Sequence, residues 1–283
     1  MPGDVGEETL EIGAVVGKRY KILSQLISKK HVAKCVASGK KERYSYMVMT
    51  LLGESLDSLL KKHGPFLNVS TQVRIGICIL FGIKQVHDKG SADERYFLVL
   101  DFGLARQYIA DEDDGLKMRR PREKTYFRGT ARYCSVAMHD RYEQGRVDDL
   151  WALVYILAEM RCRLAWHDVD DKVEIGEMKR KIHDEVLFAK SPVQMLSFVK
   201  TVRSTLFYHR PDYEKLFKLL EDVMKCANYK WSDPYHWEPE KKKNPASQGN
   251  KFGLGKKGTK ESGELPEASF FTVDDFNTNP LGF

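Results

Sequence analysis

The sequence predicts an α+β fold in which a small strand-containing lobe precedes a larger helical lobe. Before residue 52, short stretches alternate apolar and polar residues, as half-buried strands do. After it, long stretches place apolar residues at helical spacing, with glycine, proline or capping residues between them. A chain of 283 residues, 42% of them hydrophobic, is long enough to bury one sizeable core or two lobes that share one.

Few strands are expected, and most of them lie near the N-terminus. Residues 20–26 and 44–49 alternate like strands, and residues 31–37 are a third, shorter candidate. Residues 96–100 are strand-like as well, although they follow the first long helix. The small lobe is therefore expected to hold a sheet of only a few strands.

Helices account for most of the remaining chain. An amphipathic helix is expected over residues 54–63, and Gly64 and Pro65 end it. Asn68 is a suitable N-cap for a long helix that reaches about Asp88. That helix is apolar around most of its circumference, as a helix buried inside a lobe is. Four more helices are expected over residues 148–160, 172–183, 191–204 and 212–227.

Composition divides the chain into three parts. Residues 1–17 form an N-terminal extension that is acidic and has no apolar block, so it is not expected to be a signal peptide. Residues 18–231 form the folded domain, with the small lobe ending at about residue 52 and the helical lobe over residues 53–231. Residues 232–283 are rich in Lys, Gly, Ser, Pro, Asn and Glu, so a disordered tail is expected there. The end of this tail mixes aromatic and acidic residues, a composition that suits a docking or self-docking segment.

Cysteine usage and charge indicate the compartment and the class of partner. The five cysteines are scattered, as in an intracellular protein with reduced thiols, so a cytoplasmic or nuclear location is expected. No stretch is expected to span a bilayer, and no membrane partner is expected. The net charge of +6 is uneven, because acidic residues 111–114 directly precede basic residues 117–124. Such a run is either solvated surface or a site for acidic or phosphorylated protein partners, and nucleic acid is not favoured because no recognised binding motif accompanies it.

One motif carries specific chemistry. Asp101-Phe102-Gly103 directly follows the strand-like residues 96–100. A strand that delivers this tripeptide positions the carboxylate that binds the magnesium of ATP in protein kinases. Three later motifs follow in a fixed order: Leu104-Ala105-Arg106, Gly129-Thr130-Ala131-Arg132-Tyr133 and Asp148-Asp149-Leu150. This order resembles the casein kinase 1 superfamily of serine/threonine kinases, and its tau-tubulin kinase-like branch in particular.

The resemblance, which runs over about residues 16–231, implies a protein-kinase-like fold with a truncated small β lobe and a largely complete helical lobe. It implies ATP and magnesium as the cofactors of the family, with Asp101 as the metal ligand. It also places Met49, Leu51 and Leu52 at the hinge that meets adenine. Binding of both cofactors is expected to be weak or absent in this chain.

The expectation of weak binding comes from three missing parts. No glycine-rich loop follows the first strand, since residues 27–31 contain no glycine. The lysine strand and its glutamate helix are also missing, and Lys34 is a poor substitute because it falls in a later strand. The catalytic loop H-R-D-x-x-x-x-N is missing as well, and only Asp88 and Asp93 lie near its place. Because such losses act as a unit, residual phosphoryl transfer is expected to be negligible.

Two residues of the helical lobe keep positions that matter in the family. Arg132 matches the arginine of an anion site that binds phosphorylated or acidic substrates, and a guanidinium suits that task. An equally open alternative is a structural arginine that donates to nearby carbonyls. Asp149 matches the aspartate that braces the catalytic loop, so without that loop its carboxylate needs another partner or water.

Two hypotheses follow for function. The preferred one is a catalytically impaired, pseudokinase-like module that binds acidic or phosphorylated proteins in a basic groove around Arg132 and residues 117–124. The alternative is an active ATP-dependent serine/threonine kinase of which this chain is a splice form or an incomplete gene model, because the similarity resumes cleanly after each gap. The sequence leaves open whether the chain is an enzyme. Under both hypotheses the open strand edges predict low stability or reliance on a partner.

Overall fold

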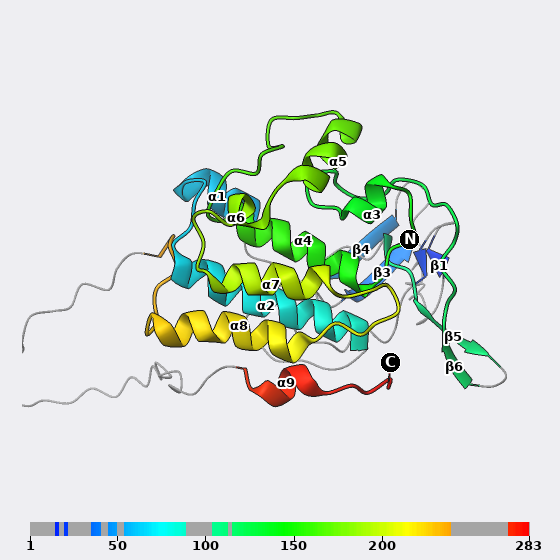
Figure 1. Cartoon of the computed structure of the whole chain (residues 1–283). Coiled ribbons are helices and arrows are strands. Elements are labelled where there is room, and N and C mark those ends of the chain that lie inside the picture. The colour runs from blue at the N-terminus through cyan, green and yellow to red at the C-terminus, as the bar shows by residue number, and fades with distance from the viewer. Residues whose placement is uncertain are drawn as a thin grey trace, which may run out of the picture.

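A computed structural model describes the chain over most of its helical part. The described residues are 15–16, 20–21, 35–40, 45–49, 54–88, 104–112, 115–238 and 271–282. Helices predominate among them, and short strand pairs lie at one side of the helical lobe (Figure 1). The mixture of small sheets and many helices agrees with the α+β prediction.

The described strands form three antiparallel pairs. These are β1 (Val15–Val16) with β2 (Tyr20–Lys21), β3 (Cys35–Lys40) with β4 (Ser45–Met49), and β5 (Ile109–Glu112) with β6 (Gly115–Met118). The predicted strand over residues 44–49 is confirmed as β4. The described end of the third candidate, residues 35–37, lies in β3, and residues 31–34 lie outside the described residues. The β5–β6 hairpin was not predicted, because its acidic and basic residues carry no apolar alternation. The expected strand over residues 96–100 lies outside the described residues.

The described helices follow the predicted order closely. They are α1 (Leu56–His63), α2 (Val69–Asp88), α3 (Val136–His139), α4 (Arg146–Glu159), α5 (Lys172–Lys181), α6 (Asp184–Leu187), α7 (Gln194–Arg203), α8 (Tyr213–Cys226) and α9 (Val273–Asn277). Capping explains several of their ends. The predicted cap at Asn68 is confirmed, since its Oδ1 accepts a hydrogen bond of 2.8 Å from the backbone N–H of Thr71. Gly64 ends α1 with a φ of 107°, a conformation that glycine adopts at little cost.

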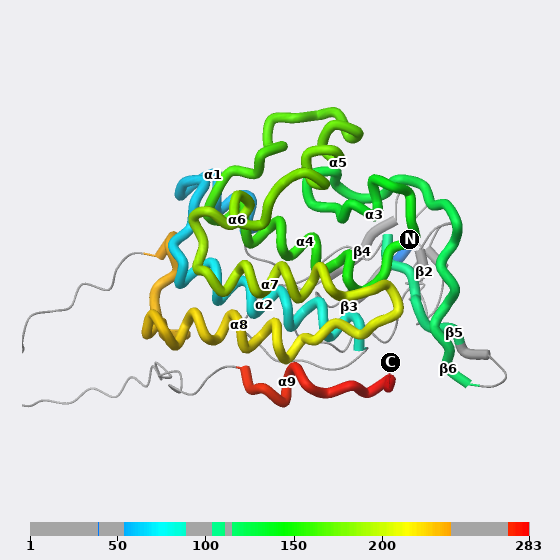
Figure 2. The backbone as a smooth tube through the Cα atoms, viewed as in Figure 1, coloured from blue at the N-terminus to red at the C-terminus, as the bar shows by residue number. Residues whose placement is uncertain are grey.

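Helix α2 is the centre of the lobe, packed against α4 and α8 (Figure 1). Its residues Val73, Ile77 and Leu80 are fully buried, at the spacing of one helix face. Gly76 lets α4 approach closely, because a Cβ atom there would lie 2.8 Å from Leu157 Cδ2. The backbone trace in Figure 2 shows α2, α7 and α8 running side by side.

Helix α2 also corrects one expectation from the sequence. With 20 residues and a mean hydropathy of 1.2, it is long and apolar enough to cross a membrane, which was not expected of any stretch. In the structure, 72% of its most apolar window is buried inside the lobe. Burial of that kind is what the core helix of a folded lobe shows.

The folded lobe extends past its expected boundary at residue 231. The guanidinium of buried Arg74 donates hydrogen bonds to the carbonyls of Asp233 (2.6 Å) and Pro234 (3.0 Å) and lies 4.2 Å above the ring of Tyr235. Trp237 stacks on Tyr235 with ring centroids 5.0 Å apart. The prediction of disorder was therefore wrong for residues 232–238, because a buried arginine satisfies its donors on this segment.

The prediction of disorder was also wrong for residues 271–282, which we call the C-terminal segment. This segment contains α9 and lies along α8 (Figures 1 and 2). Its Phe276 is fully buried and its Phe271 is 3% exposed. Two aromatic anchors supply apolar burial that the average composition of the tail did not predict. Its packing on α8 agrees with the self-docking alternative for the end of the chain, and the docking alternative stays a prediction.

Candidate functional site

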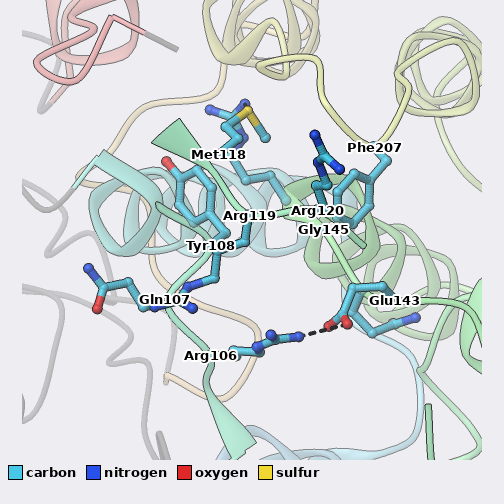
Figure 3. A pocket seen from close by; sticks show the side chains of 11 residues that line it. Arg106, Gln107, Tyr108, Met118, Arg119, Arg120, Glu143, Gly145 and Phe207 are labelled. Atoms are coloured by element: carbon cyan, nitrogen blue, oxygen red, sulfur yellow. Dashed lines mark hydrogen bonds and ion pairs between the residues drawn. The ribbon is translucent and has the colours of Figure 1, made fainter. Parts of the chain in front are cut away.

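A small positively charged pocket lies where the chain after Asp-Phe-Gly meets the start of α4 (Figure 3). Its volume of about 30 Å³ is far below the several hundred Å³ of most small-molecule sites. A pocket of this volume has room for one small chemical group. The lining residues are Arg106, Gln107, Tyr108, Met118, Arg119, Arg120, Glu143, Gln144, Gly145, Arg146 and Phe207.

Four segments of the chain bring these residues together. One precedes β5, one is the end of β6, one leads into α4, and the fourth, with Phe207, lies between α7 and α8. Gly145 is needed in the segment that leads into α4, because a Cβ atom there would lie 2.9 Å from the ring of Phe207. The backbone N–H of Arg119 donates to the carbonyl of Tyr108 at 2.8 Å and holds β6 beside the first segment.

Glu143 organises the charge of the pocket. Its carboxylate accepts a hydrogen bond of 2.7 Å from Arg106 Nη1 and one of 2.9 Å from Arg122 Nη2 (the bond from Arg106 is drawn in Figure 3). The bond from Arg122 is the main reason that the pKa of Glu143 is lowered to about 2. Arg119 and Arg120 are exposed beside this pair. One carboxylate thus faces several guanidinium groups, which leaves the pocket positive.

Arg146 forms the inner wall of the pocket. It is 3% exposed, its guanidinium lies 4.9 Å from the ring centroid of Tyr108, and its Nη2 donates to the carbonyl of Tyr208 at 3.2 Å. Burial raises the pKa of Tyr108, whose hydroxyl donates to the carbonyl of His87 at 2.9 Å. These contacts connect the pocket to the end of α2.

Arg132 lies outside the pocket lining. Its Nη1 lies 3.4 Å from Glu159 Oε1, and its Nη2 donates to the carbonyl of His167 at 3.0 Å. This arrangement matches the structural alternative considered from the sequence, in which the arginine donates to nearby carbonyls. Its role as an anion ligand stays a prediction, and the guanidinium would have to exchange Glu159 for a partner's anion.

The loop around Arg132 is fixed by Lys179 of α5. Lys179 is 4% exposed, and its Nζ donates to the carbonyls of Ala131 (2.7 Å) and Cys134 (2.6 Å). The ammonium also lies 4.5 Å from the ring centroid of Tyr155, and burial lowers the pKa of Lys179 to about 8. No sequence pattern indicated this role, because α5 is mainly charged.

The carboxylates beside the missing catalytic loop are engaged by other side chains. Asp88 ends α2 and is 5% exposed, with its Oδ2 2.7 Å from Lys84 Nζ and 3.1 Å from Arg210 Nη2. Two cations of the lobe therefore bind the Asp88 carboxylate. Of the two alternatives expected for Asp149, another partner or water, the structure shows a partner, since its Oδ2 lies 2.9 Å from Nε2 of His87. His87 is held in turn by the hydroxyl of Tyr213, 2.6 Å from its Nδ1.

Most of the residues to which the family resemblance assigns nucleotide or magnesium binding lie outside the described residues. Met49 is the last residue of β4 and pairs with Cys35. Leu51, Leu52 and Asp101 lie outside the described residues, as do Lys34 and Asp93. In the described part of the chain, no group of three His, Cys, Asp or Glu side chains is placed to hold a metal ion. The described carboxylates Asp88 and Asp149 are bound by Lys84, Arg210 and His87.

Comparison with known proteins identifies the family. No protein-family model matches the chain. It is 82% identical, over 100% of both sequences, to a putative serine/threonine-protein kinase of Caenorhabditis elegans. It is 31% identical to an inactive tau-tubulin kinase of the same organism, over 74% of this chain and 81% of that protein. It is also 31% identical to casein kinase I homolog 1 of Saccharomyces cerevisiae, over 78% of this chain and 44% of that protein.

The chain belongs to the casein kinase 1 superfamily. Its tau-tubulin kinase-like character, expected from the motif order, is confirmed by the same relatives. Kinases of this superfamily use ATP and magnesium in general. The chain spans less than half of the length of the yeast casein kinase I homolog.

The alignment with the C. elegans kinase also shows how many positions of that protein this chain lacks. That alignment extends over 346 positions, whereas this chain has 283 residues, so about 63 positions (346 − 283) have no counterpart here. The ratio of the chain length to the alignment length, 283 to 346, is 82%, and the percentage of identical positions in the alignment is also 82%. The two casein kinase 1-superfamily sequences therefore differ almost entirely by positions that this chain lacks, and hardly by substitution.

Proposed function

We propose that this member of the casein kinase 1 superfamily is a binding module for acidic or phosphorylated protein segments, and that it transfers phosphate only negligibly. The observation that carries the proposal is the positive pocket, in which Arg119 and Arg120 are exposed beside the Arg106–Glu143 pair. A phosphate or carboxylate of a partner would accept charge-assisted hydrogen bonds from these guanidinium groups. The small volume of the pocket favours a single such group on a protein over a free nucleotide.

The lack of catalysis is supported by the surroundings of the gap. A positioned general base contributes roughly 10²–10⁴ in rate, and phosphate-binding parts act together with it. Asp88, at the end of α2, is paired with Lys84 and Arg210. The similar tau-tubulin kinase of C. elegans is itself named inactive. In this proposal the small β lobe is truncated, and ATP and magnesium bind weakly or not at all.

The pocket is tested by titrating the full chain with a fluorescent phosphopeptide and with its unphosphorylated twin. We expect the phosphopeptide to bind more tightly, with an affinity that falls as salt is added. Replacing Arg119 and Arg120 together by Ala should weaken phosphopeptide binding at least about tenfold, since each lost charge-assisted bond contributes roughly 1.5–3 kcal/mol. Arg163→Ala is the matched control, because Arg163 is an exposed arginine on another part of the lobe that pairs with Asp168. Equal affinity for both peptides would refute the binding proposal.

A second candidate function is favoured by the 63 unmatched positions. Under it, this chain is a shortened or incompletely assembled form of an active serine/threonine kinase. Mass spectrometry of cellular protein distinguishes the two, because peptides across residues 26–31 and 88–93 exist only if the shortened chain is made. If those peptides are absent while peptides with an intact H-R-D loop are found, the working protein is the kinase. Transfer of γ-phosphate to casein by the purified 283-residue chain at ordinary kinase rates would refute the non-catalytic proposal directly.

A further inference from the structure

The C-terminal segment occupies an aromatic groove formed by Phe81 of α2, Phe217 of α8 and Trp231. The ring of Phe276 stacks on Phe217 with centroids 4.3 Å apart and an angle of 8° between the ring planes. It also meets Phe81 edge-on at 5.5 Å. Phe271 contacts Phe81 at 5.0 Å and Trp231 at 5.4 Å. Both segment phenylalanines are buried, so they act as the two apolar anchors of the contact.

Polar contacts fix the other end of the segment. Lys84 Nζ donates to Thr278 Oγ1 at 2.8 Å, and Arg210 Nη2 donates to the carbonyl of Thr278 at 2.6 Å. Both cations also bind Asp88, so they are held in place by the lobe. Hydrogen bonds from preorganised cations to one hydroxyl and one carbonyl set the register of the bound segment.

All of these contacts come from one continuous stretch, residues 271–278. Its sequence is Phe-Thr-Val-Asp-Asp-Phe-Asn-Thr, with two phenylalanines five residues apart and two acidic residues between them. Its short helix is capped within the segment, since Asp275 Oδ2 accepts a hydrogen bond of 2.6 Å from the backbone N–H of Thr272. An occupant therefore needs no tertiary structure of its own, which is typical of linear peptides that bind helix-lined grooves.

We propose that this aromatic groove is a peptide-docking site for partner proteins that carry a segment of the same chemistry, Phe-x₄-Phe with acidic residues between the rings and a hydroxyl two residues after the second. The chain's own C-terminal segment is the competing occupant. It is joined to Glu238 by 32 residues (239–270), and a tether of this kind raises the local concentration of the segment to roughly the millimolar range. A partner must therefore displace it. The groove is separate from the positive pocket, so the proposal is independent of the function proposed above.

The first test removes the two phenylalanine side chains that hold the C-terminal segment in the groove of the full chain. In the variant Phe271→Ala/Phe276→Ala, a fluorescent peptide of residues 268–283 should bind in an anisotropy titration. The wild-type chain should bind the same peptide at least about tenfold more weakly, because its own segment competes. A matched peptide with Phe271 and Phe276 replaced by Ala should bind neither protein. The proposal is overturned if the peptide fails to bind the folded variant, or binds the wild type equally well.

A second measurement uses the unmodified chain and so does not depend on the folding of a variant. Excess peptide should lower the hydrogen-exchange protection of the α9 amides while the amides of α8 stay protected. Binding that leaves α9 protected would place the peptide elsewhere and overturn the proposal. Light scattering that shows dimers exchanging their C-terminal segments would do the same, because the partner would then be a second copy of this chain.

Discussion

Single side chains hold the charged residues at the end of α2 and the start of α4 in this protein. His87 binds Asp149 through Nε2 and Tyr213 through Nδ1, so the aspartate that braces the loop in related kinases has a partner within the helical lobe. Asp88 is enclosed by Lys84 and Arg210 in a similar way. Because a buried carboxylate without partners is costly, the contacts with Lys84 and Arg210 offset the cost of burying Asp88 at the end of α2.

Glu143 gives a prediction at the same scale. Its pKa is about 2 in the folded protein and ordinarily 4.5, so the folded state binds its charged form more strongly. The stabilisation is fully present above pH 4.5 and is lost as the pH falls towards 2. In thermal melts, the wild-type chain should be more stable than Glu143→Gln at pH 7. This advantage should shrink as the pH drops below 4.5, and a constant difference between pH 7 and pH 3 would contradict the assignment.

At the scale of elements, α5 shows how a charged helix can be part of the core. Most of its charged residues face solvent, but Lys179 reaches inward to the carbonyls of Ala131 and Cys134. The loop that carries Arg132 is therefore fastened to a helix that follows it by about 40 residues in the sequence. Helical periodicity indicated where α5 lies, but it did not indicate which lysine is buried.

Lys179→Met tests that attachment. The methionine keeps the apolar stem but leaves two buried carbonyls without their donor, which should reduce the free energy of unfolding by about 1–3 kcal/mol. Lys181→Met is the matched control on the same helix, because the side chain of Lys181 is 78% exposed. Urea denaturation of both variants measures the effect. Equal midpoints for the two variants would show that the carbonyls find other donors.

For the whole molecule, the helical lobe and the small lobe differ in what holds them. The helical lobe has a continuous apolar core from α2 to α8, closed by residues 231–238 and by the C-terminal segment. The strand pairs described before α1 have only two strands each. Two-stranded sheets are marginal in water without a covering layer.

We therefore expect the isolated chain to melt cooperatively at or below the usual mesophile range of about 45–65 °C. Differential scanning calorimetry measures this directly. A matched comparison is the similar C. elegans kinase, whose additional positions should raise the melting temperature if they complete the small lobe. A transition of this chain well above the mesophile range would contradict the prediction of low stability.

The sequence by itself determined the family, the order of the helices, several helix ends and the absence of the three kinase parts. Those features depend on local patterns, such as the cap at Asn68, the spacing of apolar residues in α2 and the order of motifs around Asp101. Only the tertiary structure showed that the Glu143 carboxylate accepts hydrogen bonds from two arginines and that Lys179 is buried. Only the tertiary structure also showed that Phe276 stacks on Phe217, which precedes it by 59 residues in the sequence. The physical reason is that these contacts join segments far apart in the chain, so their energies depend on distances that no local pattern encodes.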